Sequence, residues 1–125
     1  MSLVLKRAYE DYDPSDGFRV LVDRLWPRGV PKAKAHIDLW LKDIAPSTTL
    51  RKWYGHDPGK WLEFQSRYFA ELNENTDAVM QLARQSQRQK VTLVYGARDT
   101  EHSHAKALKD FIDGDYVRSS DTAAR

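Results

Sequence analysis

The stretch that decides the fold is Phe18–Gly29, which reads FRVLVDRLWPRG. It begins with a short apolar run at Val20–Val22, and such a run is typical of a buried β-strand. Two arginines, an aspartate and a tryptophan follow directly. In α/β proteins, ligand sites usually lie where buried parallel strands end. We therefore expect a site here, and its residues do not by themselves name a substrate.

The composition indicates one folded domain. A chain of 125 residues fits a single domain, and 41% hydrophobic with 30% charged residues argues against disorder. The absence of cysteine excludes disulfides and thiolate chemistry. We expect a cytoplasmic protein without a membrane span, since no apolar run approaches ~20 residues and the first residues do not resemble a signal peptide. The net charge of +2 is too small to indicate nucleic-acid binding by itself.

Three apolar segments predict strands, at Leu3–Leu5, Phe18–Val22 and Val91–Tyr95. The third is apolar at nearly every position, as in a strand covered on both faces of a parallel sheet. The long helical connection between the second and third strands favours a right-handed crossover between parallel neighbours. The first connection is too short for such a crossover, so the direction of the first strand stays open. We expect an α/β domain with a central, mainly parallel sheet covered by helices.

Helix signals fill the long connection. Apolar residues at helical spacing predict a short helix, namely Ile37, Trp40, Leu41 and Ile44. That helix should end before Pro46. Ser47 is a candidate N-cap for a further helical turn, and Thr76 for a later helix. Between them, Asp57 can cap a helix whose first position suits Pro58.

One helix face should be buried, because its aromatic and apolar residues recur at spacings of three and four: Trp61, Phe64, Tyr68 and Leu72. Trp26 and Trp53 lie in loop or turn segments and are better candidates for a pocket wall. A final helix is expected over about residues 103–112. We expect a domain of residues 1–113 followed by a polar, flexible tail of residues 114–125.

Four sequence blocks are long and unusual: GFRVLVDRLWPRGVPK at residues 17–32, DLWLKDIAPSTTLRKWYGHDPGKW at 38–61, FQSRYFAEL at 64–72 and VTLVYGARD at 91–99. Together they resemble the YeaO-like family, a domain of unknown function 488, over roughly residues 3 to 112. The resemblance implies a small bacterial or archaeal cytoplasmic α/β domain with a parallel sheet and no established activity. Where the family tends to show Asn-His-Ala, this chain has Ser103-His104-Ala105, which keeps the histidine.

Parallel strands would bring remote residues to one sheet edge. These residues are Arg7 after the first strand, Asp23, Arg24, Trp26 and Arg28 after the second, and Arg98, Asp99 and His104 after the third. A guanidinium offers a planar fork of donors that fits phosphate or carboxylate. We therefore expect a small anionic ligand, bound by Arg7, Arg24, Trp26, Arg28 and Arg98. The alternative is a structural network in which Arg24 pairs with Asp23 or Asp43.

The candidate catalytic residues are Asp23, Asp99 and His104. Beside arginines, Asp23 should stay ionised and orient or stabilise charge, or else form a structural salt bridge. His104 begins a helix, whose N-terminus favours a neutral imidazole that can donate or accept a proton; the alternative is a capping or hydrogen-bonded histidine. His102 and His104 would diverge on a helix and lack further ligands, so we expect no metal and no cofactor.

Two functional classes stay open. The first is an enzyme acting on a small anionic metabolite, such as a nucleotide or phosphorylated compound. The alternative is a nucleic-acid-associated or ligand-sensing module without catalysis, motivated by arginines interleaved with tryptophans. A closed concave pocket would favour the first, and an extended basic face would favour nucleic acid. The sequence carries no dinucleotide, Walker-type or nucleophile-elbow motif, and it leaves the oligomeric state open.

Overall fold

A four-stranded parallel sheet forms the centre of the computed structural model, which describes residues 3–114. The strands are β1 (Leu3–Arg7), β2 (Phe18–Leu21), β3 (Leu39–Trp40) and β4 (Val91–Tyr95). Their order across the sheet is β1-β4-β2-β3, and every neighbouring pair is parallel. The predicted α/β class is therefore confirmed, as is the parallel pairing of β2 with β4. The open question about the first strand is answered, since β1 runs parallel to β4.

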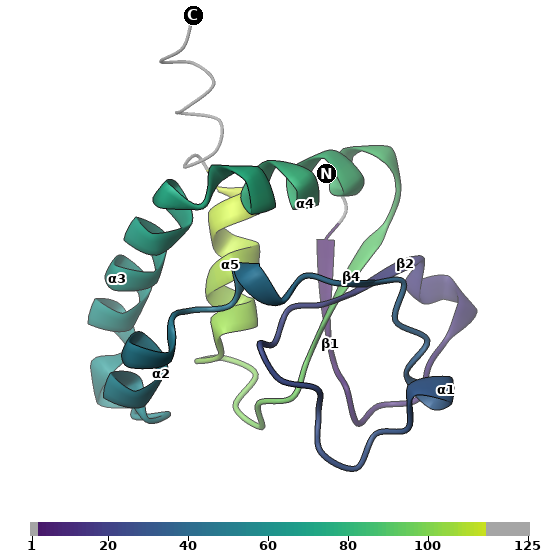
Figure 1. Ribbon diagram of the computed structural model, residues 1–125, viewed down its shortest axis with the longest axis horizontal. Helices are drawn as coiled ribbons and strands as arrows, with labels where there is room; N and C mark the ends of the chain where they lie inside the picture. The colour runs from purple at the N-terminus through teal and green to yellow at the C-terminus, as the bar shows by residue number, and fades with distance from the viewer. Residues whose placement is uncertain (1–2, 115–125) are drawn as a thin grey trace, which may run out of the picture.

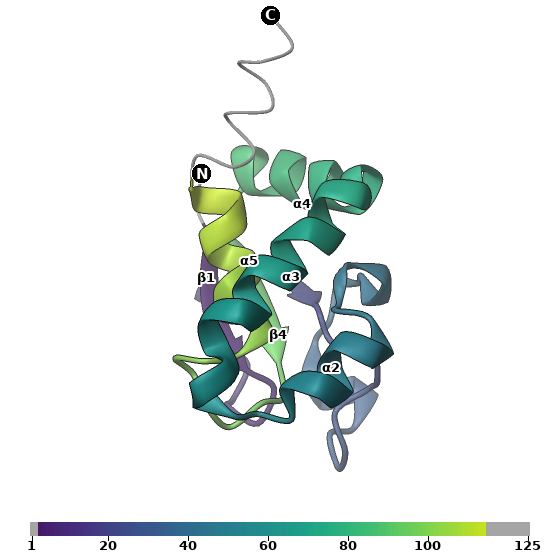
Figure 2. The same ribbon diagram turned by 90° about the vertical axis from the view of Figure 1, so that its left-hand side faces the viewer.

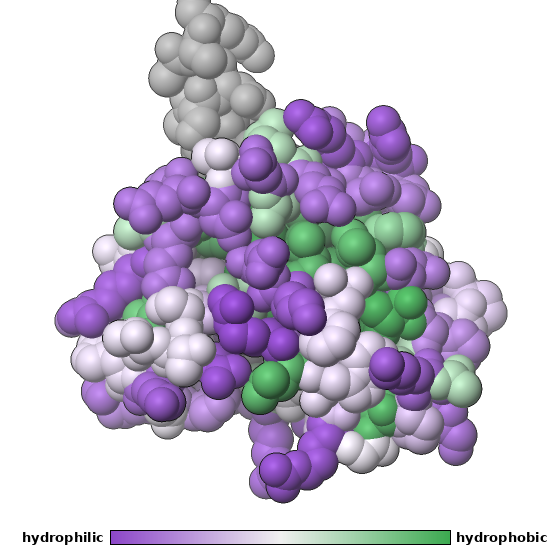
Figure 3. Space-filling view, viewed as in Figure 1, coloured by the Kyte–Doolittle hydropathy of each residue, from purple (hydrophilic) through white to green (hydrophobic). Residues whose placement is uncertain are grey.

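Helices and short 3₁₀ turns (η) connect the strands: η1 (Pro14–Asp16), α1 (Lys32–Ala35), η2 (Lys42–Ile44), α2 (Thr48–Tyr54), η3 (Pro58–Lys60), α3 (Trp61–Glu74), α4 (Thr76–Arg88) and α5 (His104–Asp113). Helices α2, α3 and α5 gather on one side of the sheet, and α4 runs across its end (Figures 1 and 2). Hydrophilic side chains cover most of α3 and α4 on the face shown in Figure 3. Within residues 3–114, no helix has the length and apolarity needed to cross a membrane.

The two faces of the sheet are covered differently. The main core lies under the helices and includes Leu93 of β4 together with Leu108 of α5. The other face carries Leu21 and Val94, and Trp26 of the loop after β2 and Trp40 of β3 pack against them. Successive side chains of a strand point to opposite faces of the sheet. Leu93 therefore packs in the main core, and its neighbour Val94 packs in the cluster on the other face. Helices therefore cover one face, while the segment of residues 22–40, which follows β2 and ends with β3, covers the other.

The predicted stripe on α3 is confirmed at three of its four positions. Phe64, Tyr68 and Leu72 are buried, whereas Trp61 is half-buried and packs against the same core. The Tyr68 hydroxyl donates to the carbonyl of Ile44, at 2.6 Å. Burial raises the pKa of Tyr68 well above its usual value. The helix thus supplies both apolar area and one satisfied buried hydroxyl.

The predicted helix over residues 37–44 is wrong. Leu39 and Trp40 instead form β3, which pairs with Val20 and Leu21 of β2, and a 3₁₀ turn follows at Lys42–Ile44. The free edge of β2 offers backbone partners that a helix here would leave unpaired. The helix-like spacing arises because the chain crosses the sheet edge, so that Ile37 and Trp40 contact one apolar cluster while Leu41 and Ile44 contact the other.

Most predicted helix starts are confirmed. The Ser47 hydroxyl accepts from Leu50 N–H and caps α2. Asp57 caps a 3₁₀ turn that begins at Pro58 and runs directly into α3. Thr76 is the first residue of α4, but Asn75 holds the N-cap position that the sequence assigns to Thr76. The predicted tail lies outside the described residues from position 115 onward.

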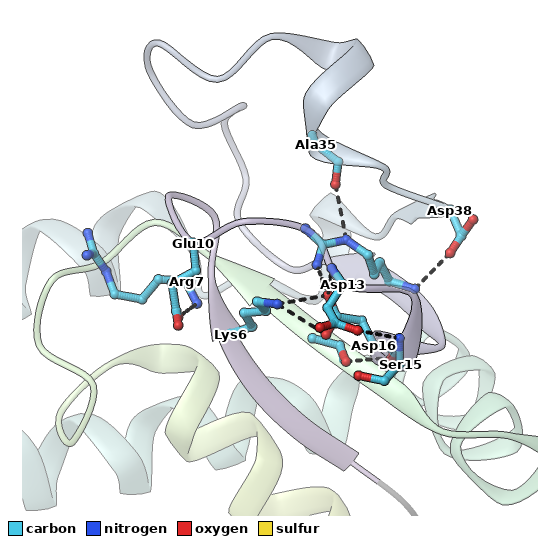
Figure 4. A network of polar contacts seen from close by, with 10 residues as sticks. Lys6, Arg7, Glu10, Asp13, Ser15, Asp16, Ala35 and Asp38 are labelled. Carbon is cyan, nitrogen blue, oxygen red and sulfur yellow. Dashed lines mark hydrogen bonds and ion pairs between the residues drawn. The ribbon is translucent and has the colours of Figure 1, made fainter.

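A network of ion pairs connects the segment between β1 and β2, residues 8–17, to the sheet (Figure 4). The Asp16 carboxylate accepts hydrogen bonds from Lys6 Nζ and from Arg19 Nη1, and the Arg19 side chain is only 1% exposed. Burial by itself raises the pKa of Asp16, but hydrogen bonds from Asp13 N–H, Lys6 and Arg19 outweigh it and hold this pKa below its usual value. Because Asp16 and Arg19 are both buried, their ion pair fixes where the loop meets β2.

Candidate functional site

A cavity of about 490 Å³ lies at the carboxyl edge of the sheet, and we call it the edge cavity. Its lining comes from Tyr9, residues 23–27, Ala45, Pro46, Arg51, Lys52, Tyr54, His56, Phe64, Gly96, Ala97 and residues 102–104. The loops after β1, β2 and β4 all contribute, because parallel strands end on the same side. Helices α2, α3 and α5 supply the remaining walls.

Asp23 and His104 meet in the wall of the edge cavity. Asp23 Oδ1 lies 3.1 Å from His104 Nε2, and both side chains are mostly buried. The same ring nitrogen lies 3.2 Å from the carbonyl oxygen of Val22. Both neighbours of Nε2 are acceptors, so this nitrogen must carry the hydrogen for either contact to be favourable. The hydrogen-bond geometry favours Val22, which leaves Asp23 Oδ1 with an electrostatic contact but no aligned donor among the described residues.

Gly96 holds the other oxygen of Asp23. Its N–H donates to Asp23 Oδ2 at 2.9 Å, which joins the residues that follow β2 and β4. A Cβ atom at Gly96 would lie 3.1 Å from Asp23 Oδ2 and 4.0 Å from Cε2 of Tyr9. A side chain here would therefore crowd the carboxylate, and glycine permits the close approach.

Arg24 is partly buried, whereas the other arginine and the lysine that line the cavity are exposed. One terminal nitrogen donates to the carbonyl oxygens of Ala45 and Pro46, at 3.2 and 3.4 Å. The Nε atom is buried and has no hydrogen-bond partner among residues 3–114. Within those residues Arg24 forms no ion pair with Asp23 or Asp43, so the alternative of a carboxylate network is not what holds it. Its position comes instead from the carbonyls that precede α2.

Most of the other lining residues were not predicted as site residues from the sequence, and three of them carry basic side chains on or just after α2. Arg51 and Lys52 are exposed on α2, and His56 follows that helix. The capping signal at Ser47 does locate α2 along the chain, but it does not say which part of the sheet α2 approaches. The contact of Arg24 with the segment before α2 decides that.

Three predicted binding arginines lie elsewhere. Among the described residues, the lining of the edge cavity does not include Arg7, Arg28 or Arg98. Arg7 donates through Nε to Ala97 O, at 2.9 Å, and so supports the loop after β4. Arg28 is exposed, and its carbonyl oxygen accepts from the Tyr9 hydroxyl at 3.1 Å. Arg98 is also exposed.

Of the two tryptophans predicted to form a pocket wall, one lines the edge cavity and the other is not in its described lining. Trp26 lines the edge cavity and is fixed by a 2.7 Å hydrogen bond from Nε1 to Val30 O. Trp53 is not among the described lining residues; Lys60 and Arg67 lie over its ring, 5.1 and 4.2 Å from the centroid. Arg67 belongs to α3 and Lys60 to η3, so these cation–π contacts help to pack α2 against both elements.

Asp99, one of the predicted catalytic residues, organises the start of α5. Its Oδ1 accepts from the N–H groups of Glu101 and His102, and its Oδ2 lies 2.9 Å from His102 Nδ1. Burial raises the pKa of Asp99, but the hydrogen bonds from His102 and Glu101 outweigh it and lower that pKa overall. Asp99 is not in the described lining of the edge cavity, whereas His102 is. Asp99 therefore contacts the cavity only indirectly, because it holds the ring of His102, which lines the cavity.

The two histidines of the His-x-His pair face different carboxylates. His102 contacts Asp99 and His104 contacts Asp23. In the part of the chain that the structure describes, no group of three histidine, aspartate or glutamate residues is placed to hold a metal ion.

Fold and site together define a small parallel α/β domain with a cationic cavity at the carboxyl edge of its sheet. The chain belongs to the DUF488 family, since the family model described as "Inactive DUF488-N3 subclade" matches residues 2–125. The resemblance to YeaO-like proteins is thereby confirmed.

Relatives come from several bacteria. The chain is 40% identical over 112 residues to the uncharacterized protein YeaO of Escherichia coli, covering 90% of this chain and 97% of YeaO. It is 45% identical over 108 residues to uncharacterized proteins of Mycobacterium tuberculosis and Mycobacterium bovis, covering 86% of this chain and 91% of each relative. No solved structure matches the chain.

Proposed function

We propose that this protein binds a small anionic ligand in the edge cavity and holds it without chemical conversion. One observation carries the proposal. Arg24 lines the edge cavity, and its Nε–H is buried and has no acceptor among the described residues. Leaving a buried donor unsatisfied costs about 1–3 kcal/mol, and more when the group is charged. A small shift of the guanidinium toward the cavity would let a ligand oxygen accept this hydrogen bond, which would remove the cost and bring the oxygen to a positive charge.

The charges around the edge cavity point the same way. Arg24, Arg51 and Lys52 contribute three permanent positive charges to the described lining, and Asp23 contributes one negative charge. The carboxylate of Asp23 is already engaged by Gly96 N–H and faces the ring of His104. The balance of charge in the lining is therefore positive, which attracts an anion and raises its local concentration.

Binding without turnover agrees with the family. The matching family model is described as an inactive subclade. Of the three predicted catalytic residues, Asp99 is occupied in the turn before α5, where it caps two N–H groups and contacts His102. Both points support a ligand-sensing module more than an enzyme.

The enzyme remains a second candidate, and the contact between Asp23 and His104 favours it. A carboxylate beside an imidazole is an arrangement that orients a general acid or base. If the protein is an enzyme, incubation with phosphate esters should release inorganic phosphate, or incubation with nucleotides should release the free base. Asp23→Asn and His104→Gln should then abolish the release. We expect no release above the uncatalysed rate from the unsubstituted protein.

Thermal shift and calorimetry test anion binding directly. The unsubstituted protein should be titrated with inorganic phosphate, pyrophosphate and sugar phosphates. A ligand at 100 times its Kd should stabilise the fold by about 2.7 kcal/mol. Arg51→Gln is the informative variant, because Arg51 is exposed on α2 and its loss should not unfold the domain. A lost charge-assisted hydrogen bond should weaken binding roughly tenfold to a hundredfold.

Arg28→Gln is the matched control, since Arg28 is an exposed arginine outside the described lining. It should leave the affinity unchanged. Equal losses in Arg51→Gln and Arg28→Gln would contradict a site in the edge cavity. Duplex and single-stranded oligonucleotides belong in the same titrations. If they bind with a steep salt dependence while small anions do not bind, the nucleic-acid module replaces this proposal.

A further inference from the structure

The edge cavity has two chemically different sides. Arg51 and Lys52 come from α2, whereas Tyr9 and Gly96 follow β1 and β4. Helix α2 and the carboxyl end of β1 lie apart in both Figure 1 and Figure 2. One side thus presents two cationic side chains, whereas the other presents the ring of Tyr9 beside Gly96, which has no side chain. An isolated inorganic anion would use only the first of these sides.

Two large hydrophobic side chains that line this cavity are exposed to solvent. Leu25 is 66% exposed and Tyr9 is 51% exposed, although both belong to the cavity lining. The Tyr9 ring is held in place, because its hydroxyl donates to Arg28 O and the Arg7 guanidinium lies 5.2 Å from its centroid. A fixed, exposed aromatic ring is a ready surface for stacking. Together, Tyr9 and Leu25 indicate contact with an apolar, planar part of a ligand.

Asp23 adds a third requirement. Its Oδ1 is buried and lacks an aligned donor among residues 3–114. A bare anion placed here would be repelled by the carboxylate, whereas a hydroxyl or amino group of a larger ligand could donate to it. The volume of about 490 Å³ is that of a site for an organic molecule.

We infer that the ligand is a phosphate ester of a planar aromatic compound, of the chemical class of a nucleoside monophosphate. The phosphate faces Arg24, Arg51 and Lys52, the ring stacks on Tyr9 beside Leu25, and a hydroxyl or amino group donates to Asp23 Oδ1. This inference rests on the proposed function, because it names the class of anion that the edge cavity binds.

Calorimetric titration separates the parts of this ligand. The probes are inorganic phosphate, ribose 5-phosphate, purine and pyrimidine nucleoside monophosphates, and an uncharged nucleoside. At least one nucleoside monophosphate should bind roughly fivefold to a hundredfold more tightly than ribose 5-phosphate, which is the usual gain from stacking one base. The uncharged nucleoside should bind more weakly than its monophosphate, because it lacks the group that meets the arginines.

Substitutions of Tyr9 locate the gain. Tyr9→Ser should reduce nucleotide affinity to that of ribose 5-phosphate and leave the affinity for inorganic phosphate unchanged. Tyr9→Phe keeps the ring and should retain most of the gain. Tyr12→Ser is the matched control, since Tyr12 is another exposed tyrosine, stacked on His36 and outside the described lining. Melting temperatures of all variants confirm that the fold is intact.

The outcomes distinguish this inference from the proposed function. If inorganic phosphate or ribose 5-phosphate binds and requires Arg51, but no nucleoside monophosphate binds more tightly, the ligand class is wrong and the anion site stands. A nucleotide gain that survives Tyr9→Ser also overturns the stacking assignment. If no probe binds, both proposals fail.

Discussion

Gly96 and Asp23 join the ends of two adjacent parallel strands, because the Gly96 N–H donates to Asp23 Oδ2 at 2.9 Å. The bond fixes one carboxylate oxygen in the wall of the edge cavity and turns the other toward His104. A backbone donor that follows β4 thereby orients a side chain that follows β2. The orientation of Asp23 depends on this pairing of strands that are far apart in the sequence.

Replacing Gly96 by alanine should disturb that carboxylate. The added Cβ would lie 3.1 Å from Asp23 Oδ2, so either the side chain or the loop must shift. Crowding of this kind typically costs about 1–3 kcal/mol, which urea unfolding would measure. In an Asp23→Ala background the same change should cost clearly less, because the crowded atom is gone. Equal costs in both backgrounds would mean that the two residues are not coupled.

Acid should weaken the fold through Asp16. The pKa of this carboxyl is below its usual 3.8 in the folded protein, so the stability it contributes is present above that value and is lost as the pH falls through the lower, folded pKa. Asp13 and Asp99 are shifted in the same direction. Urea unfolding at pH 7 and at pH 3 should show the loss.

Asp16→Asn should reduce this pH dependence and lower the stability at pH 7 by about 3–5 kcal/mol, because Arg19 would remain buried without its charge partner. Glu63→Gln is the control, since it removes only the exposed ion pair with Arg67. Such pairs contribute about 0–1 kcal/mol. A small effect of Asp16→Asn, similar to that of the control, would show that the buried network does not stabilise the fold.

Alkali should weaken the fold through Tyr68. Burial raises the pKa of its hydroxyl well above the usual 10.0, so the unfolded chain ionises first as the pH rises. The stability is therefore fully present below pH 10 and declines above it. Tyr68→Phe should reduce this alkaline decline and cost about 1–3 kcal/mol at pH 7, since Ile44 O loses its donor. An unchanged alkaline profile in Tyr68→Phe would contradict the assignment.

Substitutions along α3 should separate buried from half-buried positions. Phe64→Ala removes a side chain that is fully buried in the core and should cost about 3–5 kcal/mol. Trp61→Ala should cost less, because Trp61 is only half-buried. Leu62→Ala should change the free energy of unfolding by no more than about 0.5 kcal/mol, since Leu62 is 80% exposed. A reversed order of these costs would overturn the orientation of the helix.

The sequence by itself determined the parts of this protein that depend on local signals. Continuous apolarity in Val91–Tyr95 predicted a strand buried on both faces, and the length of the helical connection predicted its parallel pairing with β2. Caps at Ser47 and Asp57 marked helix starts, because a side-chain oxygen satisfies N–H groups only a few residues away. Strand ends also placed Asp23, Arg24 and His104 at one edge, since parallel topology brings such ends together.

Only the tertiary structure decided the rest. Residues 37–44 carry helical spacing, yet they complete the edge of β2, because its free backbone groups outweigh a weak local preference. Arg24 reaches the carbonyls before α2 instead of a carboxylate, and this contact places Arg51 in the edge cavity while Arg28 stays exposed outside it. Such choices depend on contacts between segments distant in the chain. Residue type and spacing do not encode them, since several partners satisfy the same donor equally well until the packing selects one.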